Sequence, residues 1–431
     1  MLTTPIAIAT HDPKSQRATI RIAPADLLRS VYVTGKTGTG KSVFLERLFL
    51  GAVQSGFGAC LIDPHGDLAQ TVLELLPKSL TNSVIVFAPK DTASPVGLNL
   101  LAPTPGASRS LVASMIVEVF RKLWGQTLFG PRSEHLLRNG VLMLLENPGT
   151  TLPSLLRLLV DEPYRMKLLA RVTDPVVRLY WTKEFPGLSK TFVAEVTSPI
   201  QNKLGALTAP VVRRVLGQAA PRLSLPEVMA NSRILIADLS GIGRDAAELI
   251  GAILVAGIAL AARLRDGTPE SERPPFLLVA DEFQSYMTES FAELLAEGRK
   301  FGLAAALAHQ HAAQLPDSVR SAILGNVGTV VAFRVSAEDA LALEPEFAPE
   351  VVASELIRLR RYRVALKLVR SGMPQRAMLC RTLAPLPRTA ETADSAATTT
   401  RVSSERYGRA ASAVDRDLET ALGPSSIRPP S

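Results

Sequence analysis

The sequence predicts an α/β fold with a mostly parallel sheet, an inserted all-helical domain and a disordered C-terminal tail. Short apolar, β-branched segments alternate with helical segments on both sides of a long stretch in which apolar residues recur at helical spacing. The last residues are mostly Thr, Ala, Ser, Arg and Pro, a composition typical of disorder. We therefore expect a first core segment (1–108), the helical insert (109–226), a second core segment (227–384) and a flexible tail (385–431).

Composition supports a folded, intracellular type of protein. Of the 431 residues, 47% are hydrophobic and 20% are charged, which is enough apolar material for a large core. The two cysteines, Cys60 and Cys380, lie far apart without CxxC spacing. This argues against a disulfide framework or a zinc site and favours a reducing cytoplasm. The start of the chain shows no signal-peptide pattern, so we expect a cytoplasmic protein.

The most apolar stretch, residues 249–264, is predicted to be a buried helix. Its uncharged part is shorter than the roughly 20 residues that a membrane span needs. Asp245, Glu248, Arg263 and Arg265 also flank it closely. We therefore expect no intrinsic transmembrane segment.

The order of strands and helices defines the expected core. The first 30 residues are predicted to form short extended segments, and a helix over 41–55 is expected between two strands. Strands alternating with helices indicate a mostly parallel sheet covered on both faces. The predicted strands lie at 30–34, 59–64, 83–88, 233–240, 276–283, 303–310, 329–335 and 362–369. In the tail, one short helix is predicted over 413–422.

A phosphate-binding loop follows the strand at 30–34. Residues 35–42 read GKTGTGKS, which matches the pattern G-x-x-x-x-G-K-[ST] between a strand and a helix. The glycines permit a backbone that turns its N–H groups toward an anion, at the positive end of the following helix. Lys41 is expected to bridge the β- and γ-phosphates of ATP, and the Ser42 hydroxyl to ligate Mg²⁺. The predicted nucleotide-binding residues are Gly35, Thr37, Gly38, Thr39, Gly40, Lys41 and Ser42.

Two acids at the end of another apolar strand supply the other half of a hydrolytic site. Residues 276–280 are all apolar, and Asp281 and Glu282 follow them directly. Asp281 is expected to hold Mg²⁺, and Glu282 to activate the attacking water as a general base. The alternative is that both acids only cap the helix that follows.

Taken together, these segments resemble the FtsK/HerA superfamily of ring-forming DNA motors. The resemblance is carried by GKTGTGKS, by LIDPHGDL at 61–68, by LLVADEFQSY at 277–286 and by the segments at 294–311 and 323–340. It is closest to the conjugative coupling proteins of type IV secretion (TraG/TraD-like, TraM-recognition type) and to HerA-type helicases. The family implies a RecA-like core, ATP and Mg²⁺, DNA as partner and a hexamer.

The resemblance also assigns two further residues. Gln310 matches the glutamine that senses the γ-phosphate, although it also fits an amide satisfied locally at the end of a strand. Arg299 matches the arginine finger that acts in trans on the ATP of the neighbouring subunit. It also fits a solvated helix-end arginine, and Lys300, Arg320 and Arg334 are rivals for the role. Asp63, His65 and Asp67 in the DPHGD segment either help to order the site or simply form a turn.

Two functions from different classes are compatible with the sequence. The first is an ATP-driven DNA motor, either a coupling ATPase or a HerA-like helicase, and the second is a nucleotide-dependent switch that acts on protein partners. The net charge of +8 is compatible with DNA, and residues 356–370 carry six cations and no acid. No base-reading motif is present, so DNA contacts are expected to be with phosphates. A relaxase, a nuclease or a secretion channel is an expected partner, through which the chain would associate with the membrane.

Overall fold

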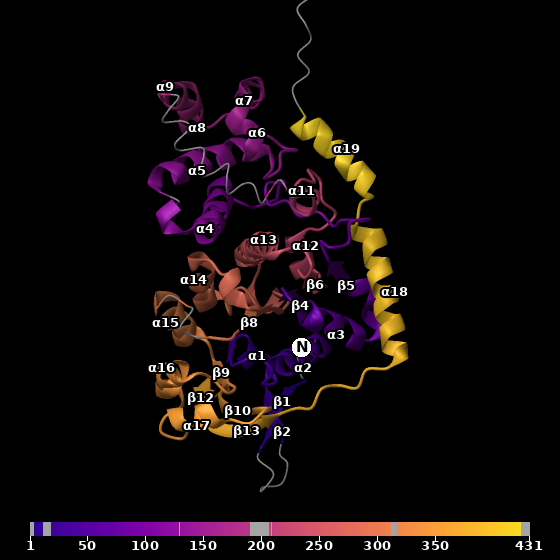
Figure 1. Cartoon of the computed structure of the whole chain (residues 1–431), viewed down its shortest axis with the longest axis vertical. Coiled ribbons are helices and arrows are strands. Elements are labelled where there is room, and N and C mark those ends of the chain that lie inside the picture. The colour runs from indigo at the N-terminus through magenta and orange to yellow at the C-terminus, as the bar shows by residue number, and fades with distance from the viewer. Residues whose placement is uncertain are drawn as a thin grey trace, which may run out of the picture. The chain divides into compact units, whose positions relative to one another are not determined.

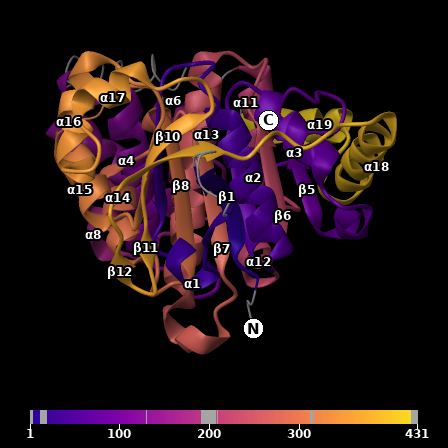
Figure 2. The same cartoon turned by 90° about the horizontal axis from the view of Figure 1, so that it is seen from below.

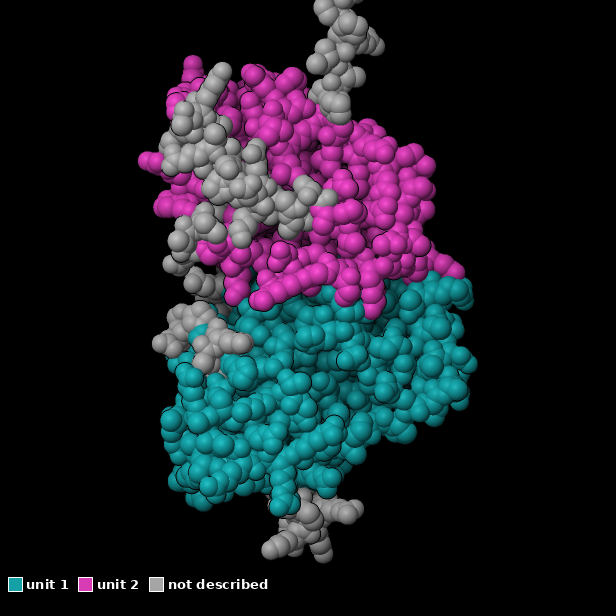
Figure 3. Space-filling model, in the orientation of Figure 1, with its two compact units in different colours: residues 1–87, 225–240, 261–403 teal, residues 88–224, 241–260, 404–431 magenta. Residues whose placement is uncertain are grey.

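The computed structural model describes residues 4–11, 19–128, 130–189, 207, 209–311, 315 and 317–423. By their internal contacts these residues form two compact units (Figure 3). Unit 1 comprises residues 1–87, 225–240 and 261–403, and unit 2 comprises residues 88–224, 241–260 and 404–431. Both units are therefore built from segments that are distant in sequence.

Unit 1 contains an 11-stranded sheet in the order β2-β1-β13-β10-β9-β3-β8-β7-β4-β6-β5 (Figures 1 and 2). The seven strands from β9 to β5 are parallel, and the four at the other side pair antiparallel. The predicted α/β fold with a mostly parallel sheet is confirmed. In chain order the strands of this sheet are β1 (Ile6–His11), β2 (Thr19–Ile22), β3 (Val31–Thr34), β4 (Gly58–Asp63), β5 (Val84–Phe87), β6 (Ile234–Asp238), β7 (Phe276–Asp281), β8 (Leu303–His309), β9 (Thr329–Ala332), β10 (Arg363–Lys367) and β13 (Met378–Thr382).

The apolar strands are buried on both faces, which is why they read as continuous apolar runs. Alternate residues of β7 and β8, such as Leu277, Val279 and Ala306, pack into one core cluster with Phe44 and Leu48 of α2. The residues between them are buried as well. The helices of unit 1 are α1 (Pro24–Leu27), α2 (Lys41–Gln54), α3 (Asp67–Leu75), α12 (Leu225–Ala230), α14 (Glu289–Glu297), α15 (Asp317–Asn326), α16 (Ala337–Phe347), α17 (Ala353–Arg358) and α18 (Ala390–Tyr407). The last residues of α18, 404–407, belong to unit 2.

Two elements of unit 1 were not predicted. The strand β13 pairs with β10 and with β1, although its sequence MLCRT has no long apolar run. A short hairpin of β11 (Val369–Arg370) and β12 (Met373–Pro374) lies between β10 and β13 in the chain. β13 depends on pairing with the distant strand β1, which local sequence patterns do not show. The hairpin strands pair only with each other and have two residues each, too few for a recognisable pattern.

Unit 2 is helical in its described residues. The helices are α4 (Arg109–Leu128), α5 (Pro131–Leu145), α6 (Ser154–Val160), α7 (Glu162–Leu169), α8 (Pro175–Leu179), α9 (Phe185–Gly187), α11 (Pro210–Leu216) and α19 (Ala411–Leu422), together with most of α13 (Arg244–Arg263). Trp181, which lies between α8 and α9, is buried and donates a hydrogen bond to the Asn139 carbonyl at 3.2 Å. Residues 190–206, which are part of the predicted helical insert, lie outside the described residues.

The helix α13 contains the apolar stretch that we predicted to be buried. Among the described residues it is the one helix long and apolar enough to cross a membrane, but 83% of its apolar window is buried inside the structure. Its composition therefore reflects a core helix, as expected.

The prediction of a disordered tail was wrong for most of that segment. Residues 390–407 form α18, whose buried face consists of the small residues Ser395, Ala396, Thr399 and Ser403. The Ser403 hydroxyl accepts a hydrogen bond at 2.8 Å from the Val86 amide of β5, the last strand of the sheet. Hydroxyl side chains can accept hydrogen bonds from the backbone amides of an edge strand, so this helix covers the edge with few large apolar residues. The short helix predicted at 413–422 is confirmed as α19.

Candidate functional site

The phosphate loop joins the central strand β3 to the start of α2. Gly38 has φ 76° and Gly40 has φ 116°, values that favour glycine. A Cβ at Gly40 would also lie only 2.6 Å from Cδ1 of Tyr362. Because α2 begins at Lys41, the positive end of this 14-residue helix faces the loop. The geometry is that of an anion-binding loop.

Lys41 brings a buried positive charge into this loop, where it forms an ion pair with Glu282. Its side chain is 8% exposed, and within the described part of the chain its Nζ atom has no hydrogen-bond partner. The nearest acid is Glu282, whose Oε1 lies 3.5 Å from Nζ. A buried ammonium without hydrogen bonds is costly, so this position fits a ligand that supplies phosphate oxygens.

The paired acids lie at the end of β7, on the same edge of the sheet. Asp281 is buried, and its pKa is raised to about 6, first by burial and then by the nearby charges of Glu282 and Asp63, while Lys41 opposes this shift. Glu282 has φ 50°, and its amide donates to Asp281 Oδ1 at 3.1 Å. The left-handed turn at Glu282 directs two successive acids into one cavity, which both residues line.

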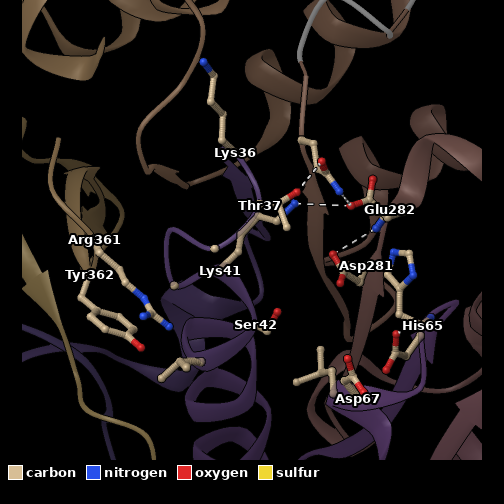
Figure 4. A pocket seen from close by; sticks show the side chains of 16 residues that line it. Lys36, Thr37, Lys41, Ser42, His65, Asp67, Asp281, Glu282, Arg361 and Tyr362 are labelled. Atoms are coloured by element: carbon tan, nitrogen blue, oxygen red, sulfur yellow. Dashed lines mark hydrogen bonds and ion pairs between the residues drawn. The ribbon is translucent and has the colours of Figure 1, made fainter. Parts of the chain in front are cut away.

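Hydrogen bonds connect the phosphate loop to Glu282 through Gln310 (Figure 4). The Thr37 hydroxyl donates to Gln310 Oε1 at 2.8 Å, and Gln310 Nε2 donates to Glu282 Oε1 at 2.8 Å. Gln284 Nε2 donates to the other carboxylate oxygen at 2.7 Å. Burial alone would raise the pKa of Glu282, but the Gln284 bond, the Lys41 charge and the Gln310 bond outweigh burial and lower it. Glu282 is therefore held as a carboxylate.

The cavity has a volume of about 380 Å³ and draws its walls from segments far apart in the chain. Ser42 and Asp281 both line it, and a hydroxyl with a carboxylate is a ligand pair that Mg²⁺ accepts. Within the described residues no group of three or more His, Cys, Asp or Glu side chains could hold a metal ion. A Mg²⁺ ion here would therefore take further ligands from phosphate and water. The lining residues are Lys36, Thr37, Gly38, Gly40, Lys41, Ser42, Val43, Asp63, His65, Asp67, Leu68, Asp281, Glu282, Gln310, Arg361 and Tyr362.

The DPHGD segment forms a turn, and its side chains also line the cavity. The Asp63 carboxylate accepts hydrogen bonds from the amides of His65 and Ala69, both at 2.9 Å, and so fixes the turn into α3. The exposed side chains of His65 and Asp67 line the cavity. Asp63 thus acts as a turn residue, and His65 and Asp67 are placed where they can meet a ligand.

Arg299 lies away from the cavity of its own chain. It is exposed, in the turn that precedes β8, whereas Gln310 directly follows the opposite end of that strand. Its neighbour Lys300 forms an ion pair with Asp266 at 3.1 Å. Any action of Arg299 on nucleotide must therefore take place in another copy of the chain, and the arginine-finger role stays a prediction.

One whole turn at the cavity was missed as part of the nucleotide site. Arg361 and Tyr362 lie in the turn between α17 and β10, and both line the cavity. In the sequence, Arg361 belongs to the basic segment 356–370 that we considered for DNA, and Tyr362 begins the predicted strand 362–369. No motif marks this turn, because it meets the phosphate loop only through folding of the sheet.

Comparisons with known proteins support the resemblance to FtsK/HerA-type P-loop ATPases. Residues 8–113 match the family model of the helicase HerA central domain. A comparison of the sequence with curated proteins found no match. Among solved structures, the plasmid coupling protein TrwB in complex with ADP and Mg²⁺ has a TM-score of 0.61 at 16% identity, over 91% of this chain and 97% of that chain. VirB4 of Thermoanaerobacter pseudethanolicus has a TM-score of 0.58 at 13% identity, over 88% and 96%.

These identities are low, so the solved structures establish the fold, which is that of the RecA-like ATPases TrwB and VirB4. The predicted resemblance is confirmed at the level of the HerA central domain and of this shared fold.

Proposed function

We propose that this chain, a relative of the HerA-type P-loop ATPases with the fold of TrwB, is an ATP-hydrolysing DNA motor. The observation that carries the ATPase assignment is the chain of hydrogen bonds from Thr37 through Gln310 to Glu282. It lies next to the buried ammonium of Lys41, which is ion-paired with Glu282 and has no hydrogen-bond partner among the described residues. A phosphate bound at Lys41 would lie beside a carboxylate that is already ionised. This is the arrangement that hydrolysis of a γ-phosphate requires.

Each side chain has a distinct task in the proposed reaction. Lys41 compensates the charge of the β- and γ-phosphates, while Glu282 accepts a proton from the water that attacks the γ-phosphorus. The bond from that phosphorus to the ADP oxygen breaks, and ADP leaves with the electron pair. Gln310 orients the water with one end of its amide and Thr37 holds the other end. Mg²⁺, bound by Ser42 and Asp281, would neutralise charge on the phosphates.

The site is incomplete without a cation from a second copy. Arg299 lies at the other end of β8 from Gln310 and does not line the cavity of its own chain. In a head-to-tail ring it would be supplied to the neighbour's γ-phosphate, and repeated contacts of this kind form a ring when the rotation between subunits closes. We propose a hexamer, as the family resemblance implies.

Contacts with DNA are proposed to involve phosphates rather than bases. Arg358, Arg360 and Arg370 are exposed, whereas Lys367 is paired with Glu346 at 3.0 Å. The basic segment is therefore divided, and only its exposed part is available to a polyanion. Contacts of this kind are independent of sequence and weaken with salt.

DNA-stimulated ATP hydrolysis tests the proposed function. We expect single- or double-stranded DNA to raise the turnover of the full chain at low and moderate salt. Lys41→Ala should hydrolyse nothing with or without DNA, which excludes a contaminating ATPase. ATP hydrolysis that no DNA stimulates would favour the second function, a nucleotide-dependent switch acting on protein partners. Absence of any nucleotide binding would contradict both.

The cellular setting is proposed from the resemblance alone. A cytoplasmic motor that docks through a relaxase, a nuclease or a secretion-channel protein fits a coupling ATPase or a HerA-like helicase. Pull-down of the Glu282→Gln variant with ATP present would enrich such a partner. Recovery of the same proteins with Lys41→Ala would argue against a nucleotide-dependent contact.

A further inference from the structure

The cavity has a second wall that the proposed hydrolysis does not use. Arg361 and Tyr362 lie on the opposite side of Lys41 and Ser42 from Asp281 and Glu282 (Figure 4). Neither residue contributes to the hydrogen bonds around Glu282. Any role of this wall at the site is therefore separate from the activation of water.

Backbone hydrogen bonds fix the position of Tyr362 relative to the phosphate loop. Its amide donates to the Thr39 carbonyl at 2.8 Å, and its carbonyl accepts from the Thr382 amide at 2.9 Å. Tyr362 has φ 65°, a conformation that bulky side chains rarely adopt. Such conformations persist where the surroundings enforce them, and they cluster at ligand sites. Glu282, on the other wall, shares this feature.

The two side chains present flat surfaces beside the phosphate loop. The Tyr362 ring lies against Gly40, where an added Cβ would meet Cδ1 at 2.6 Å and Cε1 at 3.1 Å. The Arg361 guanidinium carbon lies 4.8 Å from the centre of the ring. Arg361 is exposed and Tyr362 is half-buried, so both can be covered by a ligand. Aromatic rings and guanidinium planes are the groups on which nucleobases stack.

The wall with Glu282 and Gln310 determines which way a bound nucleotide must point. Glu282 and Gln310 mark the end at which the γ-phosphate reacts, so the nucleoside must extend away from them. We propose that the base of the nucleotide lies against Tyr362 and Arg361. This inference rests on the proposed function, because it assumes a triphosphate at Lys41. Because the base would be contacted through its flat face, this wall should accept any planar base rather than select one.

Comparing ATP with tripolyphosphate separates the base from the phosphates. Binding of each, with Mg²⁺, is measured by calorimetry on the full chain. Stacking contributes on the order of 5- to 100-fold to affinity. We expect Tyr362→Ala to weaken ATP by that factor and to leave tripolyphosphate unchanged. Arg361→Ala should show a smaller loss of the same kind, and Tyr362→Phe should bind ATP as the wild type does. Tyr407→Ala, at a tyrosine that does not line the cavity, is the matched control.

The outcomes distinguish this inference from the proposed function. Equal weakening of both ligands would mean that Tyr362 only supports the phosphate loop, and would overturn the inference. So would unchanged ATP affinity in Tyr362→Ala. If the wild type binds neither ligand, the proposed function itself fails. If Tyr362→Ala does not fold, Tyr362→Trp decides: its emission should change with ATP but not with tripolyphosphate, and an equal response to both ligands would overturn the inference.

Discussion

The two walls of the cavity are built in different ways. The wall that holds Asp281, Glu282 and Gln310 lies at the ends of two neighbouring strands. The Gln310 side chain donates a hydrogen bond to the Glu282 carboxylate, and the Glu282 amide donates one to Asp281. The wall that holds Arg361 and Tyr362 is a turn fixed through the backbone hydrogen bonds of Tyr362, and within the described residues neither side chain has a hydrogen bond to the first wall. The first is therefore set before ligand arrives, while the side chains of the second are freer to adapt.

This difference predicts two kinds of effect. The first wall is preorganised to stabilise charge and proton transfer in the transition state. Substitutions in it should therefore lower kcat. The second wall contacts a part of the substrate that does not react, so substitutions in it should mainly weaken the affinity for nucleotide. This expectation requires that one chain supplies both walls and that Arg299 of a second copy supplies the additional cation.

Arg299→Ala should have the largest effect and tests that condition. Arginine fingers contribute about 10³- to 10⁵-fold to turnover in GTPases, so Arg299→Ala alone should be nearly inactive. Mixing it with Lys41→Ala should restore activity, because an intact site on one subunit then meets Arg299 of the other. The measurement is ATP turnover of the mixture against each variant alone.

Lys300→Ala is the matched control, since Lys300 is the adjacent exposed cation and is already paired with Asp266. It should retain activity. Mixed rings, demonstrated by mass, that remain inactive would count against action in trans.

Glu282→Gln should have the next largest effect and isolates the first wall. The amide cannot accept the proton, and general-base catalysis contributes about 10²- to 10⁴-fold. ATP binding should remain, because Lys41 is unchanged and loses only its acidic neighbour. Single-turnover measurements should show bound, unhydrolysed ATP.

Glu297→Gln, at an exposed acid on α14, is the control for a general loss of charge. Wild-type turnover in Glu282→Gln would refute the assignment of Glu282 as the base. A loss of ATP affinity instead of turnover would show that the two walls are not functionally distinct.

The buried residue His309, which directly precedes Gln310 of the first wall, predicts that the stability of the protein depends on pH. His309 is buried directly before Gln310, its Nε2 is hydrogen-bonded to the Tyr32 hydroxyl, and within the described residues its Nδ1 has no hydrogen-bond partner. Burial, and then the Lys41 charge, lower the pKa of His309 to about 4, while Glu282 and Asp339 act in the opposite direction. The unfolded chain, with a histidine pKa near 6.5, therefore binds a proton that the folded chain does not.

Stability should thus fall as the pH falls from 6.5 to 4, by about 3 kcal/mol from this one residue. Urea unfolding at both ends of the range should show a smaller fall for His309→Gln than for the wild type. His65→Gln, at an exposed histidine, should behave as the wild type does. Equal falls in the wild type and His309→Gln would show that His309 is not held neutral.

The contrast between the walls also explains what the sequence could predict. Long apolar runs specify buried parallel strands, and acids or amides at their ends must meet at one edge of the sheet, so Asp281, Glu282 and Gln310 were placed correctly relative to Lys41. The turn at Arg361 and Tyr362 reaches the phosphate loop through the pairing of β9 with β10, which no local pattern shows. The helix α18 was missed because Ser403 and its small neighbours pack through hydroxyl bonds rather than apolar bulk.

Thr37→Val should have the smallest effect and gives the sharpest comparison of the walls. Valine keeps the shape of threonine but removes the hydroxyl that holds Gln310 at 2.8 Å. The Gln310 carbonyl then loses one partner, and a neutral hydrogen bond of this kind contributes about 0.5–1.5 kcal/mol, or roughly 2- to 10-fold. Because Gln310 acts on the attacking water, the loss should appear in kcat with KM almost unchanged. Thr37→Ser should restore kcat. Tyr362→Ala is expected to show the reverse, a raised KM at nearly normal kcat. If kcat and KM changed in the same way in both variants, both walls would act through the position of the phosphate loop.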